Sequence, residues 1–570
     1  MAKTNLTILF GRNALNIAAD VTVTLNAGGE QPLALASDLQ NQNSEKAYAT
    51  YEPDYWLLDG SYKFIAESAS VGYISTEQSG AAGAFTTAPV LQFDFGEVYS
   101  TDGLTLHFSE LTGDWADDID VAFYDSGLSL IQTNNYTPAS ALFSTGQAID
   151  DFQRIIITFN STNKPYRFAR LFNIDFDNVT RWSGGNIKNG KLIEEVDPLS
   201  LRMTSNQLEF SLFSDDGDFS ITNPQSEYAS LQENEPIEAY EQIGDEDIFL
   251  GRFYLDEWES VSENEAQFTA LDGFALLDKI PHYNPFYSVY SIDYSEDILD
   301  HIFATAGLIY EMEASLEGID VTSSASVPIM SCREALQNVL VYIGGVASCA
   351  RSRVVNITPL VLASDLASVF DLTLTASEKG HLSSVKLKKA VTSVTVLSHA
   401  FIEYTQSATV YSKSLAIGEY LITWDHFALV SFSGTSTRTI IEHGPDYVKV
   451  NITGAGTFTV TEAYNYKDQR LPETLENGTL SASTPRYEIH VDDALMVDST
   501  VVGDVTQRIY DYYLQRYIQK TKLFGLTVKA GDTVLIDTQS SQQIKGIVER
   551  AEFNLTGGFV SEIEIVGVIA

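Results

Sequence analysis

Residues 208–219 read LEFSLFSDDGDF, and this stretch sets the type of structure from which the chain is built. Leu208, Phe210 and Leu212 alternate with polar residues, which is the two-residue period of a half-buried strand. The strand runs directly into a cluster of Asp and Gly residues. These residues favour turns because Asp bonds its own backbone and Gly accepts positive φ. The stretch therefore predicts a strand that ends in a turn.

The acids of this turn raise an alternative, because Asp215, Asp216 and Asp218 could be metal ligands. A twelve-residue calcium loop needs ligands at alternate positions, Gly at the sixth position and Glu at the twelfth. Here Gly217 follows two adjacent acids, and the twelfth position counted from Asp215 is Ser226. The spacing fails, so the turn is the preferred interpretation and no metal ligand is predicted.

Size and charge narrow the classes of protein to which the chain can belong. Its 570 residues are too many for one hydrophobic core, so three to five domains of roughly 100 to 150 residues are expected. The 34 Lys and Arg residues stand against 77 Asp and Glu residues, which gives a net charge of −43. Such a surface repels DNA and anionic membranes. Apolar residues make up 44% of the chain, so we expect it to fold.

Neither the cysteines nor the N-terminus indicates export. Cys332 and Cys349 have no C-x-x-C spacing, and two buried thiols are expected in place of a disulfide or a zinc site. The N-terminal residues lack the apolar region of a signal peptide. No run of 18 apolar residues occurs, so no membrane-spanning segment is predicted.

Three stretches break the strand pattern with helical spacing. The first helix is predicted over residues 295–307, with Gly307 placed to close it. The second is predicted over residues 332–345, where Ser331 and Glu334 form a capping box. Its predicted apolar face is Leu336, Val339, Leu340 and Ile343. In the third, apolar and aromatic residues recur every three or four positions, at Val502, Val505, Ile509, Tyr513 and Tyr517.

The remaining blocks are predicted to be β structure. Residues 50–180 contain strands of five to eight residues separated by turn signals, which suits a jelly-roll sandwich. Residues 401–490 read as a small inserted sandwich, and the C-terminal stretch has four strand candidates of a half-barrel. The basic run KLKK at 386–389 alternates as an exposed edge strand would, and such charges guard against aggregation.

No constellation of residues indicates catalysis. The eight histidines lack metal-binding spacing, and no G-x-S-x-G, Walker or G-x-G-x-x-G motif occurs, so no cofactor is implied. Among 77 acids any carboxylate pair is uninformative, so a glycosidase is the least favoured hypothesis and the chain is predicted not to be an enzyme. Three aromatic residues in or beside predicted loops, Tyr73, Trp115 and Tyr136, are candidate carbohydrate contacts. The alternative for them is loop packing or a protein interface.

Three longer stretches resemble a known family. Residues 48–65 (YATYEPDYWLLDGSYKFI) and the following 71–97 resemble the galactose-binding-like jelly roll inserted in tail-hub proteins of phages and prophages of Gram-positive bacteria. Residues 192–280 resemble the first barrel of these hubs, most specifically through FYLDEWESVSENEAQFTALDGFALLD at 253–278. Residues 531–567 are similar to the last hub barrel.

The resemblance implies a mainly β fold with a small α/β part: two hub-type β-barrels, an α/β element and inserted β-sandwich (jelly-roll) domains. The implied domains are the start of the first hub barrel at 1–49, the galactose-binding-like jelly roll at 50–180, the rest of the first barrel at 181–282, the α/β hub domain at 283–400, the inserted small sandwich at 401–490, and a helix plus the second hub barrel at 491–570. The small sandwich is an addition to the family pattern. The chain also stops without an appended lysozyme-like or peptidase domain.

The resemblance further implies a non-enzymatic baseplate or tail-tip hub, made in the bacterial host cytoplasm and located in the virion tail or in a phage-tail-like particle. Such a hub forms a homotrimeric ring that closes the end of the tail tube. The implied partners are the distal tail protein, the tail tube or tape-measure protein, and tip or receptor-binding proteins. Genomic DNA would pass an acidic lumen without specific binding. The alternative hypothesis is an adhesin that binds host cell-wall carbohydrate through the 50–180 jelly roll.

Overall fold

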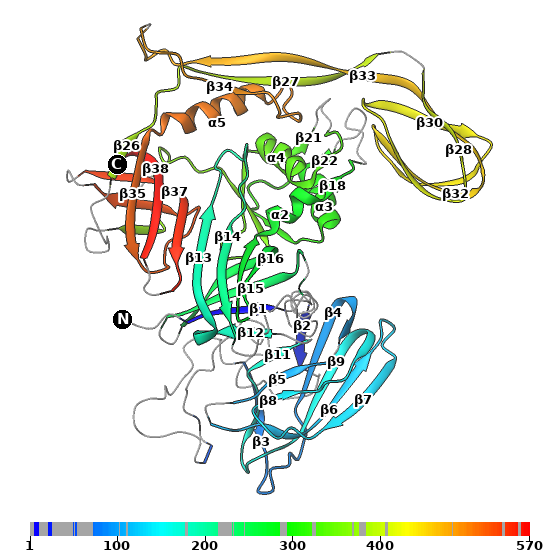
Figure 1. Cartoon of the computed structure of the whole chain (residues 1–570), viewed down its shortest axis with the longest axis vertical. Helices are drawn as coiled ribbons and strands as arrows, with labels where there is room; N and C mark the ends of the chain where they lie inside the picture. The colour runs from blue at the N-terminus through cyan, green and yellow to red at the C-terminus, as the bar shows by residue number, and fades with distance from the viewer. Residues whose placement is uncertain are drawn as a thin grey trace. The chain divides into compact units, whose positions relative to one another are not determined.

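The structure is a computed structural model, and it describes residues 5–10, 21–25, 50, 52–53, 72–101, 103–109, 112–176, 180–214, 231, 233–243, 246–284, 293–321, 327–366, 370–374, 384–404, 408–481, 483–538, 542–556 and 560–570. The predicted mainly β fold is confirmed (Figure 1). The chain divides into two compact units. Unit 1 comprises Met1–Lys188, Ser211–Leu250 and Glu257–Phe268, and unit 2 comprises Asn189–Phe210, Gly251–Asp256 and Thr269–Ala570.

A β-sandwich makes up most of unit 1. Its larger sheet has the order β2 (Val21–Leu25), β4 (Val90–Thr101), β9 (Ile149–Thr162), β6 (Ala116–Tyr124) and β7 (Leu130–Tyr136). Three further strands form a second sheet in the order β11 (Asn173–Asp175), β5 (Thr105–His107) and β8 (Leu142–Ser144), and β3 (Tyr73–Gln78) pairs with β10 (Phe168–Leu171). The sandwich therefore takes one strand, β2, from the segment before residue 50.

Alternating apolar residues of β4 and β9 fill the core of this sandwich. Phe93 and Phe95 point inward from β4, and Phe152, Ile155 and Phe159 meet them from β9. Several of these rings meet edge to face, which is the favoured geometry for aromatic pairs. The apolar residues that alternate along these strands in the sequence therefore all lie on the buried face of the sheet.

The other strands of unit 1 belong to a curled sheet. β1 (Asn5–Phe10) lies between β12 (Thr180–Ser183) and β15 (Pro236–Ile243), and both pairings are antiparallel. Three more strands, β14 (Gln207–Phe213), β16 (Glu246–Ser262) and β17 (Glu265–Leu271), continue along the chain from one unit into the other. β14 is the strand predicted at Leu208–Leu212, and Asp215, Asp216 and Asp218 after it lie outside the described residues.

Unit 2 has its own curled sheet, built mainly by the C-terminal residues. Its order is β13 (Ile187–Glu195), β37 (Gln543–Asn554), β38 (Val560–Ile569), β35 (Tyr517–Phe524) and β26 (Ser384–Leu387). β36 (Thr533–Asp537) pairs with β37 and with β25 (Leu372–Leu374). Three of the predicted C-terminal strands are confirmed as β36, β37 and β38, whereas the first candidate, from Leu523, overlaps only the end of β35. The exposed edge strand β26 includes the first two residues of the KLKK run, Lys386 and Leu387.

Three helices of unit 2 pack together (Figure 1). They are α2 (Gly273–Lys279), α3 (Ser295–Ala306) and α4 (Cys332–Ile343). Short strands accompany them: β18 (Pro281–His282) pairs with β22 (Met330–Ser331), β19 (Asp293–Tyr294) with β21 (Asp320–Val321), and β24 (Val355–Pro359) with both β20 (Tyr310–Met312) and β23 (Gly345–Ser348). Both predicted helices are confirmed, and so is the capping box of Ser331 and Glu334. Both cysteines are buried free thiols, as expected. None of the described helices is long and apolar enough to cross a membrane.

A long ribbon and a small sandwich complete unit 2. β27 (Ser393–Tyr404) pairs with β33 (Gly456–Glu476) and with β34 (Glu488–Val491), and α5 (Val502–Leu514) packs along this ribbon (Figure 1). The first half of β33 also pairs with β28 (Thr409–Leu415) and β30 (Ala428–Gly434). These strands pack against the sheet of β29 (Gly418–Thr423), β32 (Tyr447–Gly454) and β31 (Thr437–His443) around a core that includes Val450, Ile452 and Phe458.

Two details of the helix predictions were wrong. The third helix was predicted to include Tyr517, but α5 ends at Leu514 and Tyr517 begins β35. The predicted face of α4 was also too narrow. Val341 is buried as well and packs against α5 residues, because α4 lies between the core of the helical region and the core beneath α5.

Candidate functional site

Tyr73 is a core residue of the first sandwich. It begins β3, its side chain is 3% exposed, and its ring stacks on Phe159 with a centroid distance of 5.9 Å. Burial raises the pKa of the Tyr73 hydroxyl above its usual range. The ring therefore contributes to packing in this structure and does not face solvent, where a sugar would bind.

Trp115 and Tyr136 are half-buried, on neighbouring segments of the same sandwich. Trp115 directly precedes β6, and its backbone is fixed by Asn163, whose side chain accepts from the Trp115 N–H at 3.1 Å and whose N–H donates to the Trp115 carbonyl at 3.0 Å. Tyr136 is the last residue of β7 and pairs opposite Ile119 of β6. No ring-to-ring contact joins Tyr73, Trp115 and Tyr136 within the described part of the chain.

Tyr136 belongs to a small polar cluster at the edge of the sandwich. Its hydroxyl donates to Gln147 Oε1 at 3.3 Å and accepts from Asn134 Nδ2 at 3.2 Å, and Asn134 also donates to Gln147 at 2.9 Å. The Tyr136 ring meets Phe143 edge to face at 5.8 Å. An aromatic face beside amide groups can stack on a ring and hydrogen-bond hydroxyl groups at the same time.

A buried ionic network lies beneath the Trp115 loop. Arg167 Nε donates to Asp114 at 3.1 Å, and Lys164 Nζ reaches the same carboxylate at 2.7 Å. Arg170 pairs through two nitrogens with Glu52, which is 4% exposed. Two-nitrogen Arg–carboxylate pairs fix geometry as well as charge. The Arg170–Glu52 pair therefore ties residue 52, which lies between β2 and β3 in sequence, to β10.

The described residues contain no group of three or more His, Cys, Asp or Glu side chains arranged to hold a metal ion. His107 pairs with Asp175 at 2.6 Å and His399 with Asp468 at 3.0 Å, whereas His426 lies between two carboxylates, Asp425 at 3.0 Å and Glu462 at 2.7 Å.

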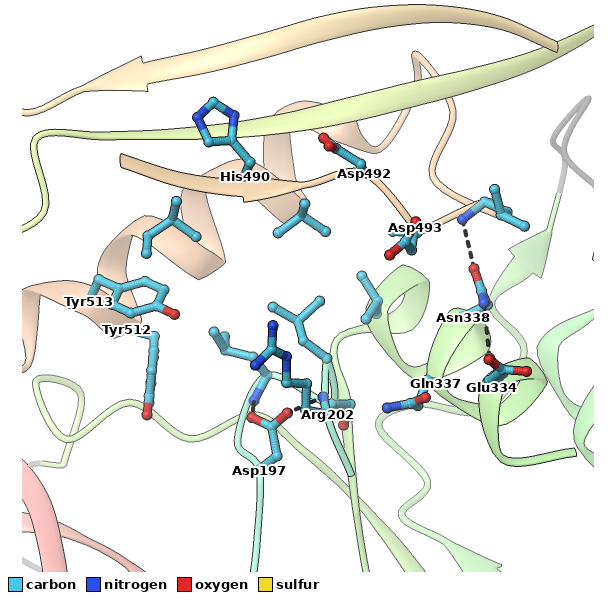
Figure 2. Close-up of a pocket in the computed structure, with 18 of the residues that line it drawn as sticks. Asp197, Arg202, Glu334, Gln337, Asn338, His490, Asp492, Asp493, Tyr512 and Tyr513 are labelled. Atoms are coloured by element: carbon cyan, nitrogen blue, oxygen red, sulfur yellow. Dashed lines mark hydrogen bonds between the residues drawn. The ribbon is translucent and has the colours of Figure 1, made fainter. Parts of the chain in front are cut away.

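A pocket of about 810 Å³ lies in unit 2, between the chain around Asp197, helix α4, the segment after β34, and α5 (Figure 2). Asp197 accepts from the backbone N–H groups of Leu199 at 3.1 Å and Arg202 at 2.6 Å. This loop places the guanidinium group of Arg202 in the pocket (Figure 2). Asn338 of α4 accepts from Leu495 N at 2.7 Å and so holds the opposite wall.

Two tyrosines of α5 form another wall of this pocket (Figure 2). Tyr512 donates to Glu549 at 2.7 Å, and Lys388 lies 4.8 Å from the centre of the Tyr512 ring. Burial raises the pKa of Glu549 as well as the pKa values of Tyr512 and Tyr513. Lys388 opposes the shift of Glu549.

The pocket has the chemistry of a binding recess. Acidic groups, one arginine and apolar side chains line it. His490 and Glu488, which also line it, form an ion pair at 3.7 Å. Sequence patterns did not predict this pocket because its lining comes from segments near residues 200, 335, 490 and 512, which no local motif connects.

Comparisons with known proteins give structural similarities only. No protein-family model matches the chain, and no curated protein matches its sequence. The 43 kDa tail protein of prophage MuSo2 from Shewanella oneidensis is similar with 10% identity and a TM-score of 0.40, over 68% of this chain and 96% of that protein. The prophage tail protein gp18 from Listeria monocytogenes EGD-e is similar with 9% identity and a TM-score of 0.37, over 68% of this chain and 91% of that protein.

A carbohydrate-binding module is similar over a shorter range. The family 32 module of NanJ from C. perfringens, solved in complex with galactose, has 9% identity and a TM-score of 0.20, over 30% of this chain and 99% of the module. These three similarities have identities of at most 10% and TM-scores below 0.5, so they concern the fold alone.

Proposed function

We propose that the chain is a structural protein of a phage tail or phage-tail-like particle, and that it serves as the hub at the end of the tail tube. One observation carries this proposal. Residues 192–280 and 531–567, which resemble the two hub barrels, contribute strands to one sheet, because Lys191–Glu195 of β13 pair with Arg550–Asn554 of β37. Arg550 adds an ion pair with Glu195 on this ladder.

A buried clamp reinforces the same junction. Arg351 Nε donates to Glu194 at 2.9 Å, and its other nitrogens donate to the carbonyl oxygens of Leu526 and Val528. Glu194 also accepts from Ala530 N at 3.2 Å. Two barrel segments more than 300 residues apart in sequence are thus held together, which supports the role of a rigid scaffold.

The ring is the second part of the proposal. Among the described residues β26 pairs only with β35, so its other edge is open, and Val385 and Leu387 are 43% and 54% exposed there. An open edge with apolar side chains is stabilised when it meets another strand. We infer that three copies associate through such edges, with the distal tail protein, the tube or tape-measure protein and the tip proteins as neighbours.

Acidity suits the passage of DNA through such a ring. At a net charge of −43 the surface repels a phosphate backbone, whereas basic contacts would make it adhere. The proposed lumen is therefore acidic, and DNA passes it without specific contacts.

Light scattering on the purified chain tests the ring. The expected mass is three times the 62.8 kDa chain mass, with a central hole in electron-microscope projections. Val385→Lys combined with Leu387→Lys should shift the population toward the monomer, because two charges would be buried at the edge. Val361→Lys, at a residue that is 39% exposed elsewhere in unit 2, should leave the mass unchanged. A monomer at every concentration, alone and with tail-tube protein, would contradict the ring.

Carbohydrate binding by the first sandwich is the second candidate function. The polar cluster of Tyr136, Asn134 and Gln147 beside the half-buried ring of Phe143 favours it. Trp115 is the other ring that remains a candidate contact, and a host cell-wall glycan is the proposed ligand.

Binding of the full chain to an array of bacterial glycans tests this second function. Tyr136→Ala should lower the affinity about two- to tenfold, since a stacked ring contributes roughly 0.5 to 1.5 kcal/mol, and Trp115→Ala should also weaken binding. Tyr166→Ala is the control, because Tyr166 is 46% exposed in the same sandwich but outside the cluster. Equal binding by all three variants would rule out this site.

A further inference from the structure

The turn between β31 and β32 contacts the helical region of unit 2. We call residues 442–447 of this turn and its flanks the tip of the small sandwich. Asp446 Oδ2 accepts from Ile329 N at 2.9 Å, and the Tyr447 hydroxyl lies 3.3 Å from the carbonyl oxygen of Tyr283. A Cβ atom on Gly444 would overlap the Asn284 carbonyl oxygen, so the two backbones touch. The tip is therefore closely packed against the chain next to β18.

A buried histidine lies at this contact. His282 of β18 is 0% exposed, and neither of its ring nitrogens has a hydrogen-bond partner among the described residues. Its ring meets the ring of His301 from α3 edge to face, with centroids 5.1 Å apart. A protonated imidazole is a donor at both nitrogens and needs two acceptors or water. Opening the contact would let water reach both nitrogens of His282.

The charged groups that act on His282 are His301 on α3 and Glu442 on β31. Glu442 also acts on His301 and His443, and the other charged groups at this end of the small sandwich are Asp446 in the turn and Lys449 on β32. Glu442 attracts a proton to His282, but Lys449 Nζ already binds this carboxylate at 2.8 Å and the Tyr447 hydroxyl binds it as well. Burial, followed by the neighbouring His301, lowers the pKa of His282 to about 3.

We propose that this contact is a pH-responsive latch, which holds the tip on the helical region at neutral pH and loosens when His282 takes up a proton. The ribbon of β27 and β33 has its own core beneath α5, so it keeps the sandwich tethered after the latch opens. The inference concerns one chain and does not depend on the proposed ring.

The direction of the pH response depends on whether each titratable group is protonated or deprotonated in the closed latch. The pKa of His282 is depressed, so its contribution is present above its ordinary pKa of 6.5 and is lost as the pH falls toward 3. Burial lowers the pKa values of His301 and His443 too, so they act in the same direction. Asp446 opposes them, because burial raises its pKa to about 6 and protonation then favours the closed state.

These opposing groups make single variants more informative than the wild type. The lowered pKa of His282 alone would raise the equilibrium constant for opening the latch about 30-fold between pH 7.5 and pH 5. The raised pKa of Asp446 would lower the same constant about tenfold. The wild-type latch should therefore loosen by about threefold, or more if His301 and His443 contribute.

Hydrogen exchange of the full chain at pH 7.5 and 5.0, corrected for the intrinsic exchange rate, measures the latch. The reporter is the amide of Ile329, which donates to Asp446 Oδ2 across the contact. The amide of Trp424, which donates to the Asp446 carbonyl within the small sandwich, and the amides of β37 and β38 serve as internal references. Exchange at Ile329 should rise at pH 5.0 while the references stay constant.

The variants separate the two opposing contributions. Asp446→Asn keeps an acceptor for Ile329 but cannot titrate, so the Ile329 amide should exchange about 30-fold faster at pH 5.0 than at pH 7.5. His282→Phe should reverse the sign, with acid slowing exchange through Asp446. His490→Gln should match the wild type, since the His490 side chain is 55% exposed on β34. Unchanged exchange in Asp446→Asn between the two pH values would overturn the latch, as would equal loosening in the Asp446→Asn, His282→Phe double variant.

Discussion

At the scale of single residues, buried carboxylates fix local structure in unit 2. Asp272 is the N-cap of α2, where its side chain accepts from Phe274 N at 3.1 Å and from Asn206 N at 2.9 Å. Its exposed fraction is 1%, and burial raises the pKa of this carboxyl to about 7, although the two N–H donors oppose the shift. The residue thus fixes the start of a helix while favouring its protonated form.

Asp272→Asn should flatten the pH dependence of stability. The protonated form of Asp272 contributes stability below its ordinary pKa of 3.8, and this contribution is lost as the pH rises through about 7. Between pH 5 and 8 the wild type should lose roughly 3 kcal/mol that the variant does not lose. Thermal unfolding followed by circular dichroism at four pH values measures the difference.

Asp278→Asn is the matched control for this prediction. Asp278 lies on the same helix, but its side chain is 58% exposed. The control should keep the wild-type slope, and a flattened slope in both variants would show that Asp272 is not the group that titrates.

At the scale of elements, α4 is the centre of the helical region. Its start is capped by Ser331 and Glu334, and its end is closed by Gly344 at a φ of 76°. Arg508 of α5 donates to the carbonyl oxygens of Val341 and Tyr342 at this end. A left-handed glycine and a cation at the last carbonyl groups both stabilise a helix C-terminus, so α5 and α4 fix each other.

Gly344→Ala should destabilise the chain by about 1 to 3 kcal/mol, because alanine is strained at positive φ and its Cβ would overlap Arg508 Nη1. Gly503→Ala has the opposite expectation. Gly503 lies inside α5, and a Cβ atom added there would have no described atom within 4 Å, so alanine should stabilise by about 0.5 to 1 kcal/mol. Urea unfolding of both variants checks the pair, and a loss of equal size in both would contradict this explanation.

Local signals in the sequence predicted most helices and strands. The ends of some elements and the contacts between them depend on residues that are distant in the sequence. Spacing and caps predicted α3 and α4, because both signals lie within one helix. The seven residues of α2 are too few to show a period. Tyr517 follows α5 at a helical interval, but pairing with Gly567 draws it into β35. Residue spacing contained no sign of the Arg351 clamp, whose partner Glu194 is 157 residues away.

The candidate site was harder to predict than the fold. Aromatic residues beside turns suggested sugar contacts, yet Tyr73 begins a strand whose first residues are buried, so its ring joined the core. Trp115 and Tyr136 are half-buried and remain predictions. The latch depends on His282 meeting Glu442 across about 160 residues of chain, a juxtaposition that only the folded molecule reveals.

At the scale of the whole molecule, charge opposes association. Each copy carries a net charge of −43, so copies that approach one another repel unless their contact surface is apolar or locally complementary. Exposed apolar residues on β26 give such a surface at one edge of unit 2.

Self-association of the chain should therefore strengthen with salt. Raising the ionic strength from about 0.02 to 0.3 M shortens the screening length from roughly 20 to 6 Å and weakens the repulsion between copies. Sedimentation velocity at the two salt concentrations should show a larger trimer fraction in the higher salt. Weaker association in high salt would instead show that the contact depends on attraction between opposite charges.

β33 runs for 21 residues without interruption and belongs to the ribbon and to the small sandwich at once. At about 3.3 Å per residue this gives a single span of roughly 70 Å. A pull along its axis loads all the rungs between β27 and β33 together in shear, so they cannot be unzipped one after another. Mechanical force on the small sandwich would thus travel to the root of the ribbon through covalent bonds, with no break in the strand along the way to absorb it.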